Sequence, residues 1–184
     1  MADEKNALQW TALGILAEGW LLTVTGKHSE AVRTIKSGVA VYRSTGATAF
    51  LPFYLSCLAH AHASLGHFHE AWDCIGDATA TIDTTKERWC AAEINRIAGE
   101  IALKSSNAAA QRGEAYFERA LAIARDQQAK SWELRAAMSM ARLWHDQGKR
   151  QQAHDLLAPV YGWFTEGFDT LDLKQARTLL DELR

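Results

Sequence analysis

The chain has 184 residues, 48% of them hydrophobic and 23% charged, which is the balance of a folded domain and excludes a disordered chain. Its formal net charge of −2 arises from 20 basic and 22 acidic residues mixed along the sequence, and this excludes the basic field expected of a nucleic-acid-binding protein. The chain starts without a signal-peptide pattern, and no apolar run approaches about eighteen residues, so we expect a cytoplasmic protein that does not bind membranes.

Apolar residues recur at helical spacing through nearly the whole chain, and the breaks fall at Gly, Ser, Thr and Asp. The spacing predicts helices over 7–25, 28–44, 49–65, 68–82, 87–105, 111–127, 131–147, 150–166 and 171–183. Strand signals are absent, because there is no Asn-Gly or Asp-Gly turn and no sustained alternation. The sequence therefore predicts an all-α fold.

Particular residues predict how some of these helices begin and end. Thr84 with Glu87 resembles a capping box, and Ser131 is the expected N-cap before Trp132. Pro52 falls in a first helical turn, where its missing N–H costs nothing. Pro159 falls inside the predicted helix over 150–166 and should kink or break that helix.

The sequence repeats itself about every forty residues. One series of small residues that follow a polar residue consists of Ala31, Ala71, Gly113 and Ala153. A second series with nearly the same spacing consists of Gly19, Ala59, Gly99 and Ala141. Two series with one period predict a stack of helix pairs that forms a single domain over 1–184. The predicted repeats are 7–44, 49–82, 87–127 and 131–166, followed by a capping helix over 171–183.

Glycines mark the turn inside three of the four predicted pairs. Gly26, Gly66 and Gly148 fall just after the first helix of a pair, where a residue with positive φ is needed. The third pair lacks this glycine and has the longer segment 105–110 instead, which explains its longer step.

The order Gly19, Gly26, Ala31 and Ile35 resembles the tetratricopeptide repeat (TPR) in a stretched form of about forty residues. The whole chain resembles the C-terminal helical region of large bacterial proteins that join a class III adenylate/guanylate cyclase domain, or another output domain, to a signal-transducing ATPase and then to TPRs. The segments EGWLLTVTGK, VYRSTGA and ERWCAAEINRIAGEIAL and the stretch from Phe117 to Leu183 carry this resemblance. It implies a right-handed TPR-like solenoid. Because it covers only the helical array, it implies neither cyclase nor ATPase activity.

No catalytic motif is found. The sequence lacks a P-loop, an H-E-x-x-H zinc motif and a G-x-S-x-G elbow, so we expect a protein that is not an enzyme and uses no cofactor. Four histidines, His60, His62, His67 and His69, are close enough in sequence to suggest a metal site. His60 and His62 point to different faces of a helix, and a turn glycine separates the two pairs. We therefore predict no metal site, with metal binding by this cluster as the alternative.

The first helix of each pair forms the inner wall of such a solenoid. The resemblance to TPRs predicts that the groove residues are Leu13, Leu16, Trp20, Phe53, His60, Glu93, Arg96, Glu100, Arg135, Met138, Arg142 and His145. This wall is apolar toward the N-terminus and charged toward the C-terminus, which suits a peptide with an apolar anchor and acidic residues.

Two interpretations of the charged part of the wall remain open. The arginines Arg96, Arg135 and Arg142 could bind carboxylates, in which case they matter more for binding than for folding. Alternatively, the charged side chains of one helix pair with one another at i+3 and i+4 spacing; these are Glu93, Arg96, Glu100 and Lys104.

The leading functional hypothesis is a non-enzymatic scaffold or regulatory module that binds a protein or peptide, as the interaction or sensor part of a bacterial signalling ATPase/cyclase-type protein. The alternative is a sensor that binds a small-molecule inducer in the concave groove. A deep pocket lined by Trp20, His60 and Arg96 would favour the sensor, whereas an open trough would favour the scaffold.

The two ends of the array carry separate predictions. The helix over 7–25 is apolar on nearly every side, so we predict a homodimer through this helix, centred on Leu13, Leu16 and Trp20. The helix over 171–183 has one apolar stripe and a polar outer face, so we expect a cap rather than a recognition element.

Overall fold

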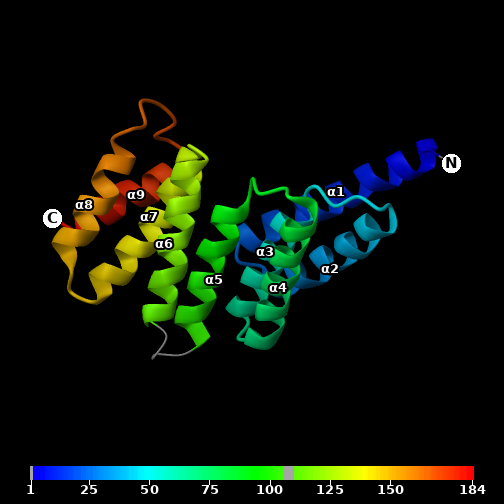
Figure 1. The fold of residues 1–184 in the computed structure, drawn as a ribbon, viewed down its shortest axis with the longest axis horizontal. Coiled ribbons are helices and arrows are strands. Elements are labelled where there is room, and N and C mark those ends of the chain that lie inside the picture. Colours follow the sequence, from blue (N-terminus) through cyan, green and yellow to red (C-terminus); the bar gives the residue numbers. More distant parts are fainter. Residues whose placement is uncertain (1, 106–109) are drawn as a thin grey trace.

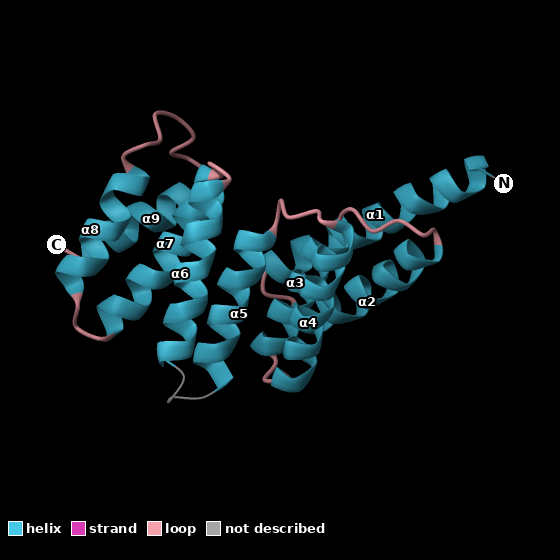
Figure 2. Cartoon of the chain, in the orientation of Figure 1, coloured by secondary structure: helices cyan, strands magenta, loops and turns pink. Residues whose placement is uncertain are grey.

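The computed structural model describes residues 2–105 and 110–184, and over these residues it contains nine α-helices and no strand. Figure 1 shows them stacked as successive antiparallel pairs, and Figure 2 shows that the described connections between them are loops and turns. The pairs are α1 (Ala2–Val24) with α2 (His28–Ser44), α3 (Leu51–Ser64) with α4 (Phe68–Thr85), α5 (Ala91–Ser105) with α6 (Ala110–Asp126), and α7 (Lys130–Asp146) with α8 (Arg150–Tyr161), followed by α9 (Leu171–Glu182). The predicted all-α helical-repeat solenoid is confirmed.

The helices form an inner and an outer layer. The odd-numbered helices contact one another in succession, from α1 to α9. Each even-numbered helix contacts its own partner and the odd-numbered helix that follows it, whereas successive even-numbered helices meet through side chains. Arg43 of α2 donates to Asp77 of α4 at 3.1 Å, and the ring of Trp72 of α4 lies 5.8 Å from the ring of Tyr116 of α6. The inner layer is therefore continuous along the backbone, whereas the outer helices are joined by side-chain contacts alone.

Glycine lets the two helices of a pair approach closely. Gly19 of α1 lies against Ile35 of α2, and Gly99 of α5 lies against the ring of Phe117 of α6. A Cβ atom at either glycine would overlap the facing side chain. The repeated small residues found in the sequence thus mark the helix crossings.

The turn glycines also behave as predicted. Gly26, Gly66 and Gly148 have φ values of 79°, 80° and 77°, in the left-handed region that favours glycine. The segment of the third pair that lacks such a glycine falls mainly on residues 106–109, outside the described residues.

Two of the predicted helix starts are wrong. Thr84 lies inside α4, where its hydroxyl donates to the carbonyl of Ala80 at 2.8 Å, so it cannot cap the next helix. The hydroxyl of the neighbouring Thr85 instead accepts a hydrogen bond from the N–H of Glu87 at 3.3 Å. Helix α7 already starts at Lys130, and its N-cap makes no side-chain hydrogen bond.

The prolines affect their helices in different ways. Pro52 lies in the first turn of α3, as predicted. Pro159 lies within α8, which ends two residues later at Tyr161 instead of continuing to 166. The missing N–H of Pro159 removes one hydrogen bond near the end of this helix, which is consistent with the early end.

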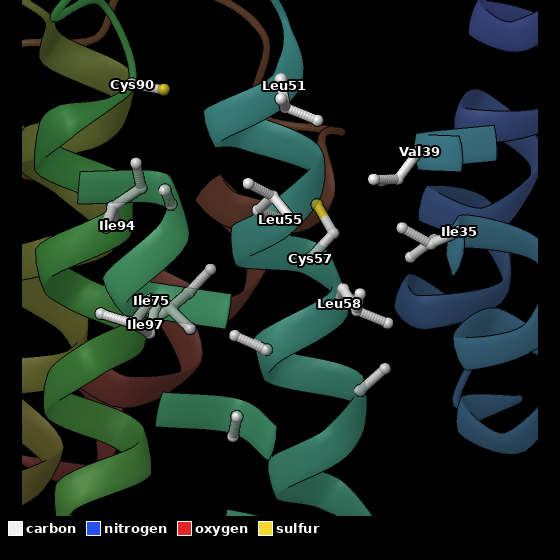
Figure 3. Packing of buried hydrophobic residues seen from close by; sticks show 14 of the residues in the cluster. Ile35, Val39, Leu51, Leu55, Cys57, Leu58, Ile75, Cys90, Ile94 and Ile97 are labelled. Carbon is white, nitrogen blue, oxygen red and sulfur yellow. The ribbon is translucent and has the colours of Figure 1, made fainter. Parts of the chain in front are cut away.

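The buried apolar residues form two clusters that follow one another along the array. The first cluster spans α1 to α5; Figure 3 shows Leu55 and Leu58 of α3 between Ile35 of α2 and Ile94 of α5. The second cluster spans α6 to α9. Its end is closed by the predicted stripe of α9, which is buried at Leu173, Ala176, Leu179, Leu180 and Leu183.

The face that helix α1 buries within the chain differs from the one expected from the sequence. Leu16 is fully buried against α2 and is not free to meet a second copy, whereas Leu13 is partly buried against the same cluster. The apolar side chains that α1 leaves exposed are Leu8, Trp10, Trp20, Leu21 and Val24. By length and composition alone, the segment Asn6–Val24 would be sufficient to cross a membrane.

Candidate functional site

A pocket of about 300 Å³ lies where the five inner helices converge. Its lining comprises Trp20, Thr23 and Val24 of α1, Phe53, Cys57 and His60 of α3, Glu93, Arg96, Ile97 and Glu100 of α5, Arg135, Met138, Ser139 and Arg142 of α7, and Leu171, Asp172 and Gln175 of α9. Within the described ranges, no outer helix contributes to it. The first helix of each pair thus forms the concave wall, as the repeat pattern predicts.

Most of the predicted groove residues meet in this pocket. They are Trp20, Phe53, His60, Glu93, Arg96, Glu100, Arg135, Met138 and Arg142. Three predicted residues do not. Leu13 and Leu16 pack into the core beside α2, and His145 lines a separate hollow between α7 and α9 together with Lys174.

Helix α9 supplies the residues that the sequence analysis missed. Leu171, Asp172 and Gln175 line the pocket, although the sequence analysis assigns this helix only the role of a cap. Its apolar stripe covers the end of the second cluster, whereas residues of its first turns line the pocket. The repeat period contains the signal, because Leu171 follows the predicted start of the preceding inner helix, Ser131, by one forty-residue step.

Arg96 is the centre of an ionic network. Its Nε donates to Oε2 of Glu93 at 2.7 Å, and its Nη2 donates to Oε1 of Glu93 at 2.8 Å. Its Nη1 donates to Glu100 and, at 3.3 Å, to the hydroxyl of Ser139 on α7. The internal pairing along α5 is therefore realised, and Arg96 has few donors left for a ligand.

Arg135 is engaged much more loosely. Its Nη1 lies 2.9 Å from Oε1 of Glu93, while its Nε lies 3.6 Å from Oδ2 of Asp172, beyond hydrogen-bond distance. The two partly exposed side chains face the pocket, with 29% of Arg135 and 38% of Asp172 accessible. Arg142 is exposed two turns further along α7, and the described residues offer it no ion pair.

Burial and neighbouring charges set the ionisation of two pocket residues. Burial alone would raise the pKa of Glu93, but the charge and hydrogen bonds of Arg96, with the charge of Arg135, outweigh it and hold the pKa below its usual range. Burial lowers the pKa of His60 to about 4, because the opposing effect of Glu100 is smaller. His60 is therefore neutral at neutral pH, and its Nε2 lies 3.8 Å from Glu100.

Aromatic rings extend the apolar side of the pocket. The ring of Phe53 lies 5.6 Å from Trp89 and 6.5 Å from Trp132, measured between centroids. The guanidinium carbon of Arg135 lies 5.5 Å from the centroid of Trp132. An apolar ligand group at Phe53 would thus lie beside the loosely engaged cation.

The described residues contain no cluster of side chains that could hold a metal ion. No three His, Cys, Asp or Glu side chains of this part of the chain converge. Of the histidines near the α3–α4 turn, His62 is buried with both ring nitrogens unpaired, whereas His69 is exposed and lies 3.6 Å from Asp73. Burial raises the pKa of the Cys57 thiol to about 12, so it is not a nucleophile at neutral pH.

The stacked pairs, the turn glycines and the inner groove define a TPR-like helical-repeat protein. No protein-family model matches the sequence, and no curated protein matches it either. Among solved structures, the fold is similar to nearly identical TPR-like repeats from a Podosopora anserina protein described as a kinesin light chain. Two crystal structures of these repeats, one of a glutamine-to-methionine variant, give a TM-score of 0.65 at 17% identity. The match covers 95% of this chain and 85% or 86% of theirs. At this identity the likeness shows the fold alone.

Proposed function

We propose that this protein is a non-enzymatic binding module whose concave groove holds a protein or peptide partner. The observation that carries the proposal is the convergence of all five inner helices on one pocket, with apolar residues toward α1 and charged residues toward α7. Helical repeats of this kind present long curved surfaces for binding rather than catalytic groups. Arg135 and Arg142 would receive acidic groups of the partner, because Arg96 is occupied by Glu93 and Glu100.

The resemblance of the sequence to the helical region of bacterial cyclase–ATPase–TPR proteins supports a place for this module in signal transduction. In such a protein the array would act as a cytoplasmic interaction or sensor part that controls an output domain. Sequencing the DNA that flanks the gene tests this proposal directly. An adjoining ATPase or cyclase reading frame is the expected result, and its absence would count against it.

A matched pair of charge reversals tests whether the groove binds the partner. Arg142→Glu changes the pocket, whereas Arg177→Glu makes the same change on an exposed position of α9 that lies outside the pocket. We expect that the wild type and Arg177→Glu capture the same partner from a lysate and that Arg142→Glu loses it. Equal capture by both variants would show that binding uses another surface.

A small-molecule sensor is the second candidate, and one specific observation favours it. The sequence analysis takes a deep pocket lined by Trp20, His60 and Arg96 as the mark of a sensor, and these three residues do line one partly enclosed pocket. Its volume of about 300 Å³ is at the lower end of the range for small-molecule sites. Purified protein should then be stabilised against heat by a low-molecular-weight extract, since a ligand that binds only the folded state raises the melting temperature.

The homodimer remains a proposal with a changed centre. Because Leu16 is buried within its own chain, contact between two copies would use the exposed Trp10 and Leu21 instead. Trp10→Glu, at a side chain that is 73% exposed, should abolish association without unfolding the chain. Sedimentation equilibrium at tens of micromolar measures this, and a monomeric wild type would refute the dimer.

A further inference from the structure

The charges in the pocket are balanced. Three carboxylates, of Glu93, Glu100 and Asp172, face three guanidinium groups, of Arg96, Arg135 and Arg142. The only histidine in the lining, His60, is neutral at neutral pH. A ligand with a net charge would leave one charge in this partly enclosed space without a partner, which is costly. A ligand of zero net charge that carries both signs avoids this cost.

Arg135 and Asp172 present the two signs next to each other. Their facing atoms are 3.6 Å apart, too far for a hydrogen bond, and both side chains are accessible from the pocket. Asp172 lies in the first turn of α9, where the helix dipole stabilises its negative charge, and Glu93 holds Arg135 from behind at 2.9 Å. Both charges are therefore held in place although they bind each other weakly.

Apolar surface adjoins this pair of charges. Phe53, Met138 and Leu171 line the same pocket, and the Trp132 ring links Phe53 to the guanidinium of Arg135. A ligand whose charged groups contact Arg135 and Asp172 from the pocket side would therefore place a neighbouring side chain against aromatic and aliphatic carbon.

We propose that the pocket binds a free α-amino acid with a large apolar side chain. Its carboxylate accepts hydrogen bonds from the free N–H groups of Arg135, its ammonium group donates to Asp172, and its side chain packs near Phe53 and Met138. This proposal rests on the second candidate function, the small-molecule sensor. A peptide segment within the groove is disfavoured here, because it lacks the adjacent free ammonium and carboxylate groups.

Titration calorimetry on the full chain tests the ligand class. The probes are L-phenylalanine, L-leucine and L-methionine, with 3-phenylpropionate lacking the ammonium group and 2-phenylethylamine lacking the carboxylate. We expect at least one of the three amino acids to bind. Each of the two phenylalanine analogues should bind at least about tenfold more weakly than phenylalanine, because the missing charged group leaves its partner in the pocket unpaired. Absence of binding by all three amino acids at about 10 mM would overturn the proposal, as would binding of either analogue as tightly as phenylalanine.

The variant Asp172→Asn tests the residue assignment with little change in shape. The matched control is Asp181→Asn on the same helix, at a position outside the pocket whose carboxylate faces Arg184 at 3.5 Å. We expect Asp172→Asn to weaken amino-acid binding about tenfold or more, with no loss of 3-phenylpropionate binding, and Asp181→Asn to change neither. If Asp172→Asn strengthens the binding of both the amino acid and 3-phenylpropionate, then Asp172 only competes with the ligand for Arg135, and the proposal is wrong.

The two proposals can fail separately. Capture of a protein partner that depends on Arg142, without binding of any amino acid, would overturn the amino-acid proposal and leave the binding module intact. Binding of an amino acid that depends on Asp172, without any captured partner, would support the sensor and overturn the peptide-binding function.

Discussion

The two junctions that α5 makes within the inner layer differ in chemistry. Toward α3 it is apolar, with Ile94 and Ile97 packed against buried residues such as Leu55. Toward α7 it is ionic, because Arg96 joins Glu93 and Glu100 to Ser139. Among the described residues, the buried charged side chains all belong to α5 and α7. The two junctions of α5 thus separate apolar packing from the buried charges that line the pocket.

Arg96→Ala should have the largest effect on this contrast. It leaves the buried carboxylate of Glu93 without its main partner, so we expect the free energy of unfolding to fall by about 3–5 kcal/mol. At the apolar junction Leu55→Ala should cost about 2–5 kcal/mol through the cavity it creates. The double change Glu93→Leu with Arg96→Met should recover much of the loss, since it removes both charges. Urea unfolding measures all three, and a loss below about 1 kcal/mol for Arg96→Ala would contradict a buried network.

Gly19→Ala and Gly99→Ala test whether both halves depend on close helix crossings. Each adds a Cβ that overlaps a neighbouring side chain, so we expect each to cost about 1–3 kcal/mol. The control is Gly76→Ala in α4, where a Cβ meets nothing within 4 Å. This control should stabilise the helix by about 0.5–1 kcal/mol. Equal melting temperatures for Gly19→Ala and Gly76→Ala would refute the role of the crossing.

Acid should destabilise the surroundings of His62 and of Glu93 over different pH ranges. Burial, with the charge of Lys36, lowers the pKa of His62 from 6.5, so its contribution to stability is complete above about 6.5 and falls as the pH decreases below that value. The pKa of Glu93 is held below 4.5, so its contribution is complete above about 4.5 and falls as the pH decreases through the folded-state value. His62→Leu should therefore improve the melting temperature more at pH 5 than at pH 7. An equal difference at both pH values would contradict a neutral buried His62.

Arg142→Ala should have the smallest effect on stability and a large effect on binding. The side chain is exposed and has no ion pair in the described residues, so we expect a change in unfolding free energy of about 0–1 kcal/mol. Arg177→Ala on α9 serves as the control for a simple loss of surface charge. Thermal unfolding and partner capture together decide this, and a large loss of stability for Arg142→Ala alone would show a structural role.

The repeat period made much of the fold and of the pocket predictable. It located the helix pairs, and the resemblance to TPRs assigned residues such as Phe53, Met138 and Arg142 to the inner wall, where they line the pocket. The period alone could not tell a groove position from a core position on α1. Leu16 faces α2, where Gly38 leaves room for it, and only the packed structure shows this.

The charged residues were harder to assign than the apolar ones. Sequence spacing allowed Arg96 either to bind a ligand or to pair with Glu93, and burial decides for the pair, because an unpaired buried charge is unfavourable. The expectation that Arg96, like Arg142, matters little for folding is therefore replaced by the large effect given above. The part of α9 in the site was missed for another reason, since a polar face at the end of an array also suits solvent.

The continuous inner layer also determines the order in which the pocket can form. Helices whose backbones pack closely are no more than two apart along the described chain, which favours rapid folding, pair by pair, as the polypeptide leaves the ribosome. The pocket is different, because it draws on both α1 and α9, which do not pack against each other in the described structure. A nascent chain would therefore have stable repeats well before it could bind, and binding would begin only when α9 has emerged.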